Sequence, residues 1–465
     1  MIRLFSVSLP TSVVLLLLSE SILIAACYVV AGWFALNANI VEPSFYFLYE
    51  NGWAQVLLVV VIIQMGLYLM DLYNDFPKLA SRVFLVQQLC VVLGVAFLLQ
   101  AVVGYSESTA LQLPQWTMVY GSLFVLVAIP LWRTVFYRLI LSALPPKRLL
   151  FLGTSPVIGE VDQTLRERPE LGFQVAGYLG DPEGPGASAR LHLGDLADVR
   201  QVVAKLKPDR IVMVPTEPSR LPTQALLDLR MEGVHLEEAA TLYEQVFGRV
   251  PIQILEPYHL IFSRNLSPRQ GVFRLQTAYS FLLALVGLVL LGPIMAVVAL
   301  LVKLTSKGPA LYSQQRVGLN RRVFRLYKFR SMYIDAESRT GPVWATKNDP
   351  RITPLGRWLR KLRLDELPQF FNVLRGEMSM VGPRPERPEF CEVLEKKIPY
   401  YHQRHAVKPG ITGWAQINLK YTDNIEESAT KLEYDLYYVK HMAPALDAYI
   451  LFHTLKVMLL SRGAQ

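Results

Sequence analysis

The residues best suited to chemistry are two adjacent carboxylates, Asp365 and Glu366, in a segment rich in arginine. Arg360 and Arg363 precede the pair, and Arg384 follows it. A guanidinium donates two parallel hydrogen bonds to phosphate oxygens, and a carboxylate can hold a divalent metal or attack phosphorus. The pattern indicates phosphate chemistry. Its alternative is an amphipathic helix whose charges form a solvated face.

Local signals place this pair at a break between two helices. Thr353 followed by Pro354 is a typical N-cap and first helical position, and apolar residues then recur at helical spacing. Pro368 interrupts that pattern just after the carboxylates, and a second apolar helix over 370–374 should end at Gly376. Carboxylates at a helix break, with guanidiniums on both sides, favour a functional site.

Composition points to a membrane protein with a large soluble part. The 465 residues allow two or three domains, and 52% hydrophobic against 18% charged residues is too apolar for an ordinary soluble chain. A formal net charge of +9 suggests soluble mass on the cytoplasmic side. No basic-aromatic module supports a nucleic-acid partner. Three cysteines support neither a disulfide framework nor a zinc site.

Residues 1–145 contain four apolar segments, each close to the ~20 residues that a bilayer requires. They run roughly over 13–36, 53–73, 83–104 and 116–141. Lysine and arginine occur before the first segment and after the second and fourth, whereas the other two loops carry only acidic charges. The positive-inside rule therefore predicts a four-span anchor with both ends in the cytoplasm, and Arg133 near the last span is expected to snorkel. A buried soluble bundle is the alternative.

Residues 146–262 change character. Three strand-like runs, LLFLGTSP, FQVAGYL and RIVMVP, alternate with helical patterns, which predicts a small parallel, Rossmann-like α/β domain. Its first turn, GTSPVIG, lacks the three-glycine dinucleotide fingerprint. A packing or regulatory module is therefore favoured over a nucleotide site.

Residues 263–465 begin with a run from 275 to 302 that is long enough to cross a membrane and carries no charge. Both flanks are basic, so a single crossing would place the basic segment 316–408 outside, against the positive-inside rule. Gly292 and Pro293 lie in mid-run, where a helix can bend. These observations predict a re-entrant helix that enters and leaves on the cytoplasmic face, with a simple crossing as the alternative.

The rest of this third domain is expected to be mostly helical. A short hairpin around 311–330 carries Lys328 and Arg330, and KPGITGWAQ places Trp414 between turn residues. The last apolar helix fits the membrane interface or a protein core equally well. With a helix dipping into one leaflet, Asp365 and Glu366 would lie at the level of lipid phosphates.

Three passages resemble one family. YKFRSM (327–332), RKLRLDELPQFFNVLRGEMSMVGPRP (360–385) and KPGITGWAQ (408–416) are similar to the bacterial polyprenyl-phosphate sugar-1-phosphate transferases, monotopic phosphoglycosyltransferases that begin exopolysaccharide, O-antigen or capsule assembly. The resemblance covers about residues 270–465, and the preceding anchor and α/β module resemble the long form of the family.

The resemblance implies that sugar-1-phosphate moves from a UDP-sugar to undecaprenyl phosphate at the bacterial inner membrane, releasing UMP, with Mg²⁺ required. Asp365 would be the nucleophile that forms a covalent phosphosugar intermediate, and Glu366 would help hold Mg²⁺ or manage a proton. Arg360 and Arg384 match arginines near the transferred or acceptor phosphate. Lys328 and Arg330 match the KFR motif without assigned roles. A re-entrant helix is also a family feature, although Gly292-Pro293 replaces the Ser-Pro expected in many members.

Two rival functions stay open at this stage. One is a polyprenyl-linked transferase or phosphatase in which Asp365 acts only on a metal. The other is a non-catalytic membrane scaffold that recruits polysaccharide-assembly enzymes through the α/β module. The motifs do not distinguish one sugar from another, and pairing into a homodimer through the spans or the α/β module is equally open.

Overall fold

The structure is a computed structural model that describes residues 2–4, 7–9, 11–37, 42–70, 72–73, 82–105, 112–136, 138, 145–186, 188–214, 221–256, 270–334, 349–419 and 424–459. Two short strands, β1 (Ile2–Leu4) and β2 (Val7–Leu9), pair with each other. The chain divides into two compact units, formed mainly by residues 8–237 and 238–465.

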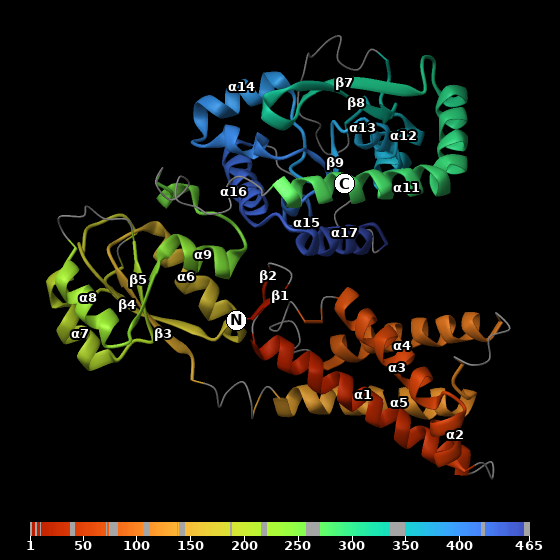
Figure 1. The fold of residues 1–465 in the computed structure, drawn as a ribbon, viewed down its shortest axis with the longest axis horizontal. Coiled ribbons are helices and arrows are strands. Elements are labelled where there is room, and N and C mark those ends of the chain that lie inside the picture. Colours follow the sequence, from red (N-terminus) through yellow and green to blue (C-terminus); the bar gives the residue numbers. More distant parts are fainter. Residues whose placement is uncertain are drawn as a thin grey trace. The chain divides into compact units, whose positions relative to one another are not determined.

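The first unit opens with apolar helices at the predicted positions. They are α1 (Thr11–Asn37), α2 (Pro43–Tyr49), α3 (Gly52–Leu69), α4 (Arg82–Tyr105) and α5 (Gln115–Val135). All but the short α2 are long and apolar enough to cross a membrane. Helix α1 packs on α3 and α5, and α4 packs on the same two helices (Figure 1).

A buried ion pair links α1 to α5. The Arg133 Nε lies 2.5 Å from Glu20 Oε1, Tyr73 donates a hydrogen bond to the same carboxylate, and Arg133 Nη1 donates to the carbonyl of Leu72 at 3.0 Å. Glu20 is fully buried. The prediction that Arg133 snorkels outward is therefore wrong, because Glu20, a charge inside the first apolar segment, gives it a buried partner.

The α/β part of this unit has a four-stranded sheet in the order β4-β3-β5-β6. Its elements are β3 (Lys147–Leu152), α6 (Pro156–Glu167), β4 (Phe173–Leu179), α7 (Val199–Leu206), β5 (Arg210–Met213), α8 (Thr223–Met231) and β6 (His235–Glu238), with 3₁₀ turns η4 (Pro169–Leu171) and η5 (Leu196–Asp198). Strand β3 runs parallel to both β4 and β5, as predicted for an α/β module. Strand β6 was not predicted, since HLEE lacks an apolar run.

The second unit is mostly helical. It starts with α9 (Ala239–Phe247), η7 (Ile252–Ile254), α11 (Gln270–Thr305), β7 (Leu311–Val317), η8 (Leu319–Arg321), β8 (Val323–Phe329), α12 (Pro354–Lys361), η9 (Leu364–Glu366) and α13 (Gln369–Leu374). It continues with β9 (Ser379–Val381), α14 (Pro388–Lys397), η10 (Tyr401–Ala406), β10 (Gly410–Thr412), α15 (Trp414–Asn418), α16 (Ile425–His441) and α17 (Pro444–Leu459). Strands β7 and β8 form the predicted antiparallel hairpin, while β9 and β10 pair in parallel.

Helix α11 is the apolar helix of this unit, and most of its large side chains are exposed. It stays helical for 36 residues, through Gly292 and Pro293, so the chain does not leave the helix at the predicted break. Figure 1 shows that the helix nevertheless turns sharply along its length before it reaches β7. A proline removes one helical hydrogen bond and crowds the preceding turn, which explains a bend without a loss of helix.

Polar contacts fix both arms of α11 to the unit. Near its start, Gln276 Nε2 donates to Asp447 on α17 and to the Tyr438 hydroxyl on α16, both at 2.7 Å, and Tyr438 donates to Asp447 at 2.8 Å. At its end, the buried Arg330 donates to the carbonyl of Ser306 at 2.7 Å and to that of Val302 at 3.3 Å. Carbonyls at a helix C-terminus lack intrahelical partners, so a guanidinium there satisfies them.

The segment after β6 packs within the second unit. Glu244 on α9 accepts from Lys440 on α16 at 2.7 Å, and Arg249 pairs with Glu433 at 3.2 Å. Trp414 Nε1 donates to the carbonyl of Gly248 at 2.7 Å. The glycine has a φ of +65°, and a side chain there would press on the indole. Trp414 in the KPGITGWAQ motif thus anchors this segment.

Candidate active site

The carboxylate pair lies where the chain reverses between two helices. The Thr353 hydroxyl accepts from Gly356 N at 2.9 Å and caps α12, as predicted. Gly356 approaches the carbonyl of Ser331 so closely that a Cβ would lie 2.0 Å from it. Arg363 then takes a left-handed conformation, φ +55°, and redirects the chain into η9, which contains Asp365 and Glu366. These local features fix the pair against the end of β8.

Two cations hold Glu366. Lys328 Nζ on β8 lies 2.9 Å from Glu366 Oε1, and Arg384 Nη2, three residues beyond β9, lies 2.6 Å from the same oxygen. Burial opposes ionisation of Glu366, but Arg384 and Lys328 outweigh it and hold the pKa of this carboxyl far below its usual range. Glu366 is therefore an ionised, fixed negative charge and a poor proton acceptor near neutral pH.

Asp365 has the opposite electrostatics. Burial raises the pKa of this carboxyl, Lys328 opposes the rise, and the charge of Glu366 adds to it. Its side chain is only 7% exposed, and it makes no hydrogen bond or ion pair to any residue that the structure describes. Adjacent carboxyls whose surroundings push their pKa values apart are typical of catalytic pairs with different roles. The unengaged carboxylate suited to attack is Asp365.

The remaining predicted site residues separate into two groups. Arg360, in the last turn of α12, donates from Nε to the Ser331 hydroxyl at 3.1 Å, and its charge acts on Asp365. The structure thus brings Arg360, Lys328 and Arg384 together with the carboxylates. Arg330 instead points to the end of α11, so its contacts favour a role in fixing that helix.

A buried ion pair fixes the backbone of Arg384 in place. Arg404 on η10 pairs with Asp435 on α16, with Nη2 2.7 Å and Nε 3.0 Å from Oδ2. The same Nη2 donates to the backbone carbonyl of Arg384 at 2.8 Å. Both partners are 2% exposed as side chains. Arg404 thereby fixes the backbone from which the Arg384 guanidinium reaches Glu366.

Sequence reasoning passed over Asn372, a fully buried residue in the apolar run of α13. Its Oδ1 accepts from Tyr327 N at 3.1 Å, and its Nδ2 donates to the Arg325 carbonyl at 2.7 Å. These bonds hold α13 against β8, the strand that carries Lys328. A lone amide among phenylalanine, valine and leucine was the available signal, since a buried polar group needs partners.

The carboxylate pair can be tested against the expected Mg²⁺. Among the described residues no three carboxylate, histidine or cysteine side chains cluster as a metal site. Mg²⁺ in phosphate-processing proteins commonly uses one or two carboxylates, waters and substrate phosphates. Asp365 has free oxygens, whereas Oε1 of Glu366 is already engaged by two cations. The donor set fits Mg²⁺ bound through Asp365, with the second oxygen of Glu366 as a further ligand.

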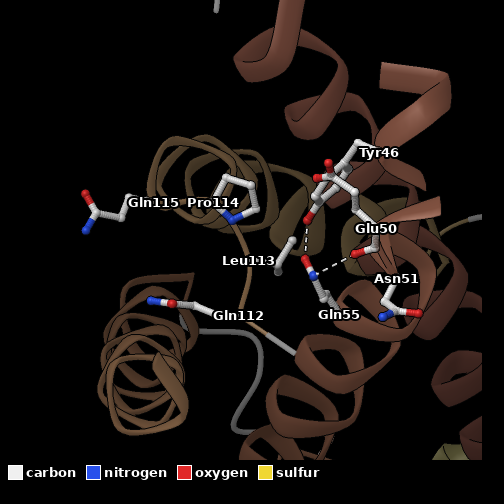
Figure 2. Close-up of a pocket in the computed structure, with 8 residues that line it drawn as sticks. All are labelled: Tyr46, Glu50, Asn51, Gln55, Gln112, Leu113, Pro114 and Gln115. Carbon is white, nitrogen blue, oxygen red and sulfur yellow. Dashed lines mark hydrogen bonds between the residues drawn. The ribbon is translucent and has the colours of Figure 1, made fainter. Parts of the chain in front are cut away.

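A cavity occurs in the helical part of the first unit. Its volume is about 560 Å³, and its lining comes from α2, α3 and the residues around the start of α5 (Figure 2). Tyr46 donates to Gln55, and Gln55 Nε2 donates to the carbonyl of Glu50 at 3.1 Å. None of the predicted site residues lines it.

A sequence model of the bacterial sugar transferase family matches residues 272–461. The UDP-glucose:undecaprenyl-phosphate glucose-1-phosphate transferase of Klebsiella pneumoniae is 35% identical over 319 residues, which cover 66% of this chain and 67% of that protein. The chain belongs to the bacterial sugar transferase family. Lys328 and Arg384, the two cations that hold Glu366, both lie inside the matched region of this chain.

Two further relatives of this chain carry related names. The UDP-N-acetylgalactosamine-undecaprenyl-phosphate N-acetylgalactosaminephosphotransferase of Aeromonas hydrophila is 41% identical over 222 residues, 48% of this chain and 52% of that protein. The undecaprenyl-phosphate glucose phosphotransferase of Komagataeibacter xylinus is 31% identical over 329 residues, 68% of this chain and 60% of that protein. The chain thus spans between half and two thirds of the length of these relatives.

Substituting the two carboxyls should change stability in opposite directions. Glu366→Gln should lower the thermal midpoint at pH 7, because a carboxyl with a depressed pKa stabilises the fold when ionised. That contribution is present above the ordinary glutamate value of 4.5 and is lost only in stronger acid. Asp365→Asn should raise the midpoint at pH 7, because the ionised form of a group with a raised pKa costs folding free energy.

Thermal unfolding in detergent at pH 7 measures both shifts. Glu392→Gln, at an exposed position on α14, is the matched control and should leave the midpoint unchanged. Shifts of the same sign for the two site variants would contradict the opposite electrostatics of Asp365 and Glu366.

Removing the Arg404–Asp435 ion pair should affect stability and catalytic activity differently. Arg404→Met should reduce the free energy of unfolding by about 3–5 kcal/mol, because Asp435 stays buried without its partner. Arg404→Met with Asp435→Leu should recover most of that stability but no activity, since neither variant holds the Arg384 carbonyl. Denaturant unfolding measures the free energy of unfolding of each variant, and an activity assay on the same preparations measures its catalytic turnover. Full activity in the double variant would show that the support is dispensable.

Proposed function

We propose that the protein transfers sugar-1-phosphate from a UDP-sugar to undecaprenyl phosphate, releasing UMP, as the first membrane step of exopolysaccharide synthesis. The carrying observation is a free, buried carboxylate, Asp365, beside an ionised Glu366 held by Lys328 and Arg384. The names of the relatives support the acceptor, because they share undecaprenyl phosphate. They name different sugars, so the donor sugar is not assigned.

In the first step, an oxygen of Asp365 attacks the sugar-proximal phosphorus of the UDP-sugar. A bond forms between that oxygen and phosphorus, the bond to the bridging oxygen breaks, and UMP leaves with the electron pair. The raised pKa of Asp365 reflects a poorly solvated carboxylate, which favours attack once it is ionised. Arg360 and Arg384 would neutralise charge on the diphosphate so that an anion can approach.

In the second step, a phosphate oxygen of undecaprenyl phosphate attacks the phosphorus of the aspartyl phosphosugar. The bond from phosphorus to Asp365 breaks, and the carboxylate is restored with undecaprenyl-diphosphate-sugar as product. Mg²⁺ held by Asp365 and Glu366 would supply further charge neutralisation of the diphosphate. A two-step route lets a soluble donor and a lipid acceptor use one site in turn.

The proposed setting is the cytoplasmic face of the bacterial inner membrane. The four long helices of the first unit would form the anchor, and α11 would be a re-entrant helix. Its exposed apolar surface, its bend and the basic residues on both flanks support this topology. Exposed apolar side chains on α12 and α13, Trp358 and Phe371, would then lie in the interface.

UMP release tests the reaction. Purified protein with undecaprenyl phosphate, Mg²⁺ and a panel of UDP-sugars should release UMP with at least one donor. Asp365→Asn should abolish release, because the nucleophile is lost. Mass spectrometry of protein incubated with donor alone should find a phosphosugar on the peptide containing Asp365. Active protein without this adduct would instead favour direct transfer, and inactivity with every donor would favour the scaffold function.

Labelling of single cysteines tests the topology. In a variant in which Cys27, Cys90 and Cys391 are replaced by alanine, Lys307→Cys, just beyond α11, should react with an impermeant maleimide only after the inner membrane is opened. Glu50→Cys, in an acidic loop expected on the other side, is the control and should react in intact spheroplasts. Reaction of Lys307→Cys in intact spheroplasts would refute the re-entrant helix and favour a simple crossing.

A further inference from the structure

Lys408 is a buried lysine outside the carboxylate site. It lies two residues before β10, and the residue is only 9% exposed. Its Nζ donates to the Thr277 hydroxyl on α11 at 3.4 Å and lies 5.5 Å from the centroid of the Phe273 ring. Among the residues that the structure describes, no carboxylate pairs with it.

Two other cations of this unit do have such a partner. Arg404 pairs with Asp435, and Lys431 pairs with Glu386. A buried charge without a counter-charge is costly, and burial lowers the pKa of Lys408 accordingly. The surroundings of Lys408 thus provide a hydroxyl and an aromatic face but lack an anion.

The position of Lys408 suggests where that anion comes from. Thr277 and Phe273 belong to the first turns of α11, where Leu275 begins the exposed apolar surface of the helix. On the other side lies Gly376, just after α13, where a Cβ would lie 3.8 Å from Lys408 Nζ. If α11 enters the membrane, the ammonium lies at the level of lipid headgroups.

This location is distinct from the carboxylate site. Glu366 precedes α13 and Gly376 follows it, so the six-residue helix, about 9 Å long, separates the two places. Lys408 contacts neither Asp365 nor Glu366 in the described structure. An anion bound at Lys408 would therefore be separate from the phosphates bound at the carboxylate site. It would lie where α11 enters the bilayer.

We propose that Lys408, with the Thr277 hydroxyl, binds the phosphate headgroup of a membrane lipid. A lysine ammonium suits phosphate as a compact point charge, and a hydroxyl can donate to a second phosphate oxygen. The exposed Arg274 on the same stretch of α11 adds positive charge. The lipid is either a bilayer phospholipid or, on the basis of the proposed function, a polyprenyl phosphate held before it reaches Asp365.

Native mass spectrometry of the full chain in detergent can count bound lipids. The probes are undecaprenyl phosphate, dioleoyl phosphatidate, phosphatidylglycerol and phosphatidylcholine, each titrated separately. Lys408→Met should weaken binding of phosphate-headgroup lipids by about tenfold or more, because a charge-assisted hydrogen bond is lost. Lys397→Met, at an exposed position on α14, is the matched control and should bind as the unaltered protein does.

The probes separate the two sources. A loss confined to undecaprenyl phosphate identifies the acceptor, and a loss shared with phosphatidate and phosphatidylglycerol identifies bilayer lipid. Unchanged binding of all probes by folded Lys408→Met would overturn the site. This experiment measures lipid binding and not catalysis. If the protein releases no UMP with any donor, but Lys408→Met still loses lipid binding, the proposed function is refuted and the lipid site is supported.

A second variant tests the site if Lys408→Met does not fold. Phe273→Glu would place a carboxylate over the ammonium as an internal competitor and should weaken binding of the same lipids. The aromatic ring is partly exposed, so the fold should accept this change. Undiminished lipid binding by Phe273→Glu would overturn the proposal independently.

Discussion

The arrangement of the second unit depends on one shared oxygen. Oε1 of Glu366 is held by Lys328 from β8 and by Arg384 from the segment after β9. A single carboxylate thus joins three stretches of chain that are not neighbours in sequence. Because this charge is neutralised by fixed cations, the adjacent Asp365 is left without a partner among the described residues, and the two carboxyls differ in character although their backbones are adjacent.

The surrounding protein keeps these cations in place from several directions. Asn372 holds β8 through backbone bonds, and the Arg404–Asp435 pair holds the carbonyl of Arg384. Arg330, two residues beyond Lys328, ends α11. Supporting groups that are themselves hydrogen-bonded limit the motion of a site, which is what preorganised charge stabilisation of a transferred phosphoryl group requires. The apolar helix and the site are thus parts of one packed body.

Sequence reasoning reached the features that are encoded locally. The Thr353 cap, the end of α13 at Gly376 and the β7–β8 hairpin were predictable, since each depends on residues within one turn or hairpin. The hydrogen-bond partners of Arg330 and Arg133 could not be predicted, because residue type alone does not show which buried group a guanidinium will contact. Strand β6 was missed because its polar sequence lacks strand periodicity, and Gly292-Pro293 bends α11 without ending it.

The contact between Arg404 and Asp435 has a consequence for biogenesis. Lys328, Glu366, Arg384 and Asp435 emerge from the ribosome in that order, and the last of them is needed to fix the third. Contacts of high sequence separation form late in folding. The apolar α11 is synthesised before all four, so the charged site can assemble only after this helix has left the ribosome. A nascent chain therefore contains the whole of α11 before it contains the residues that complete the carboxylate site.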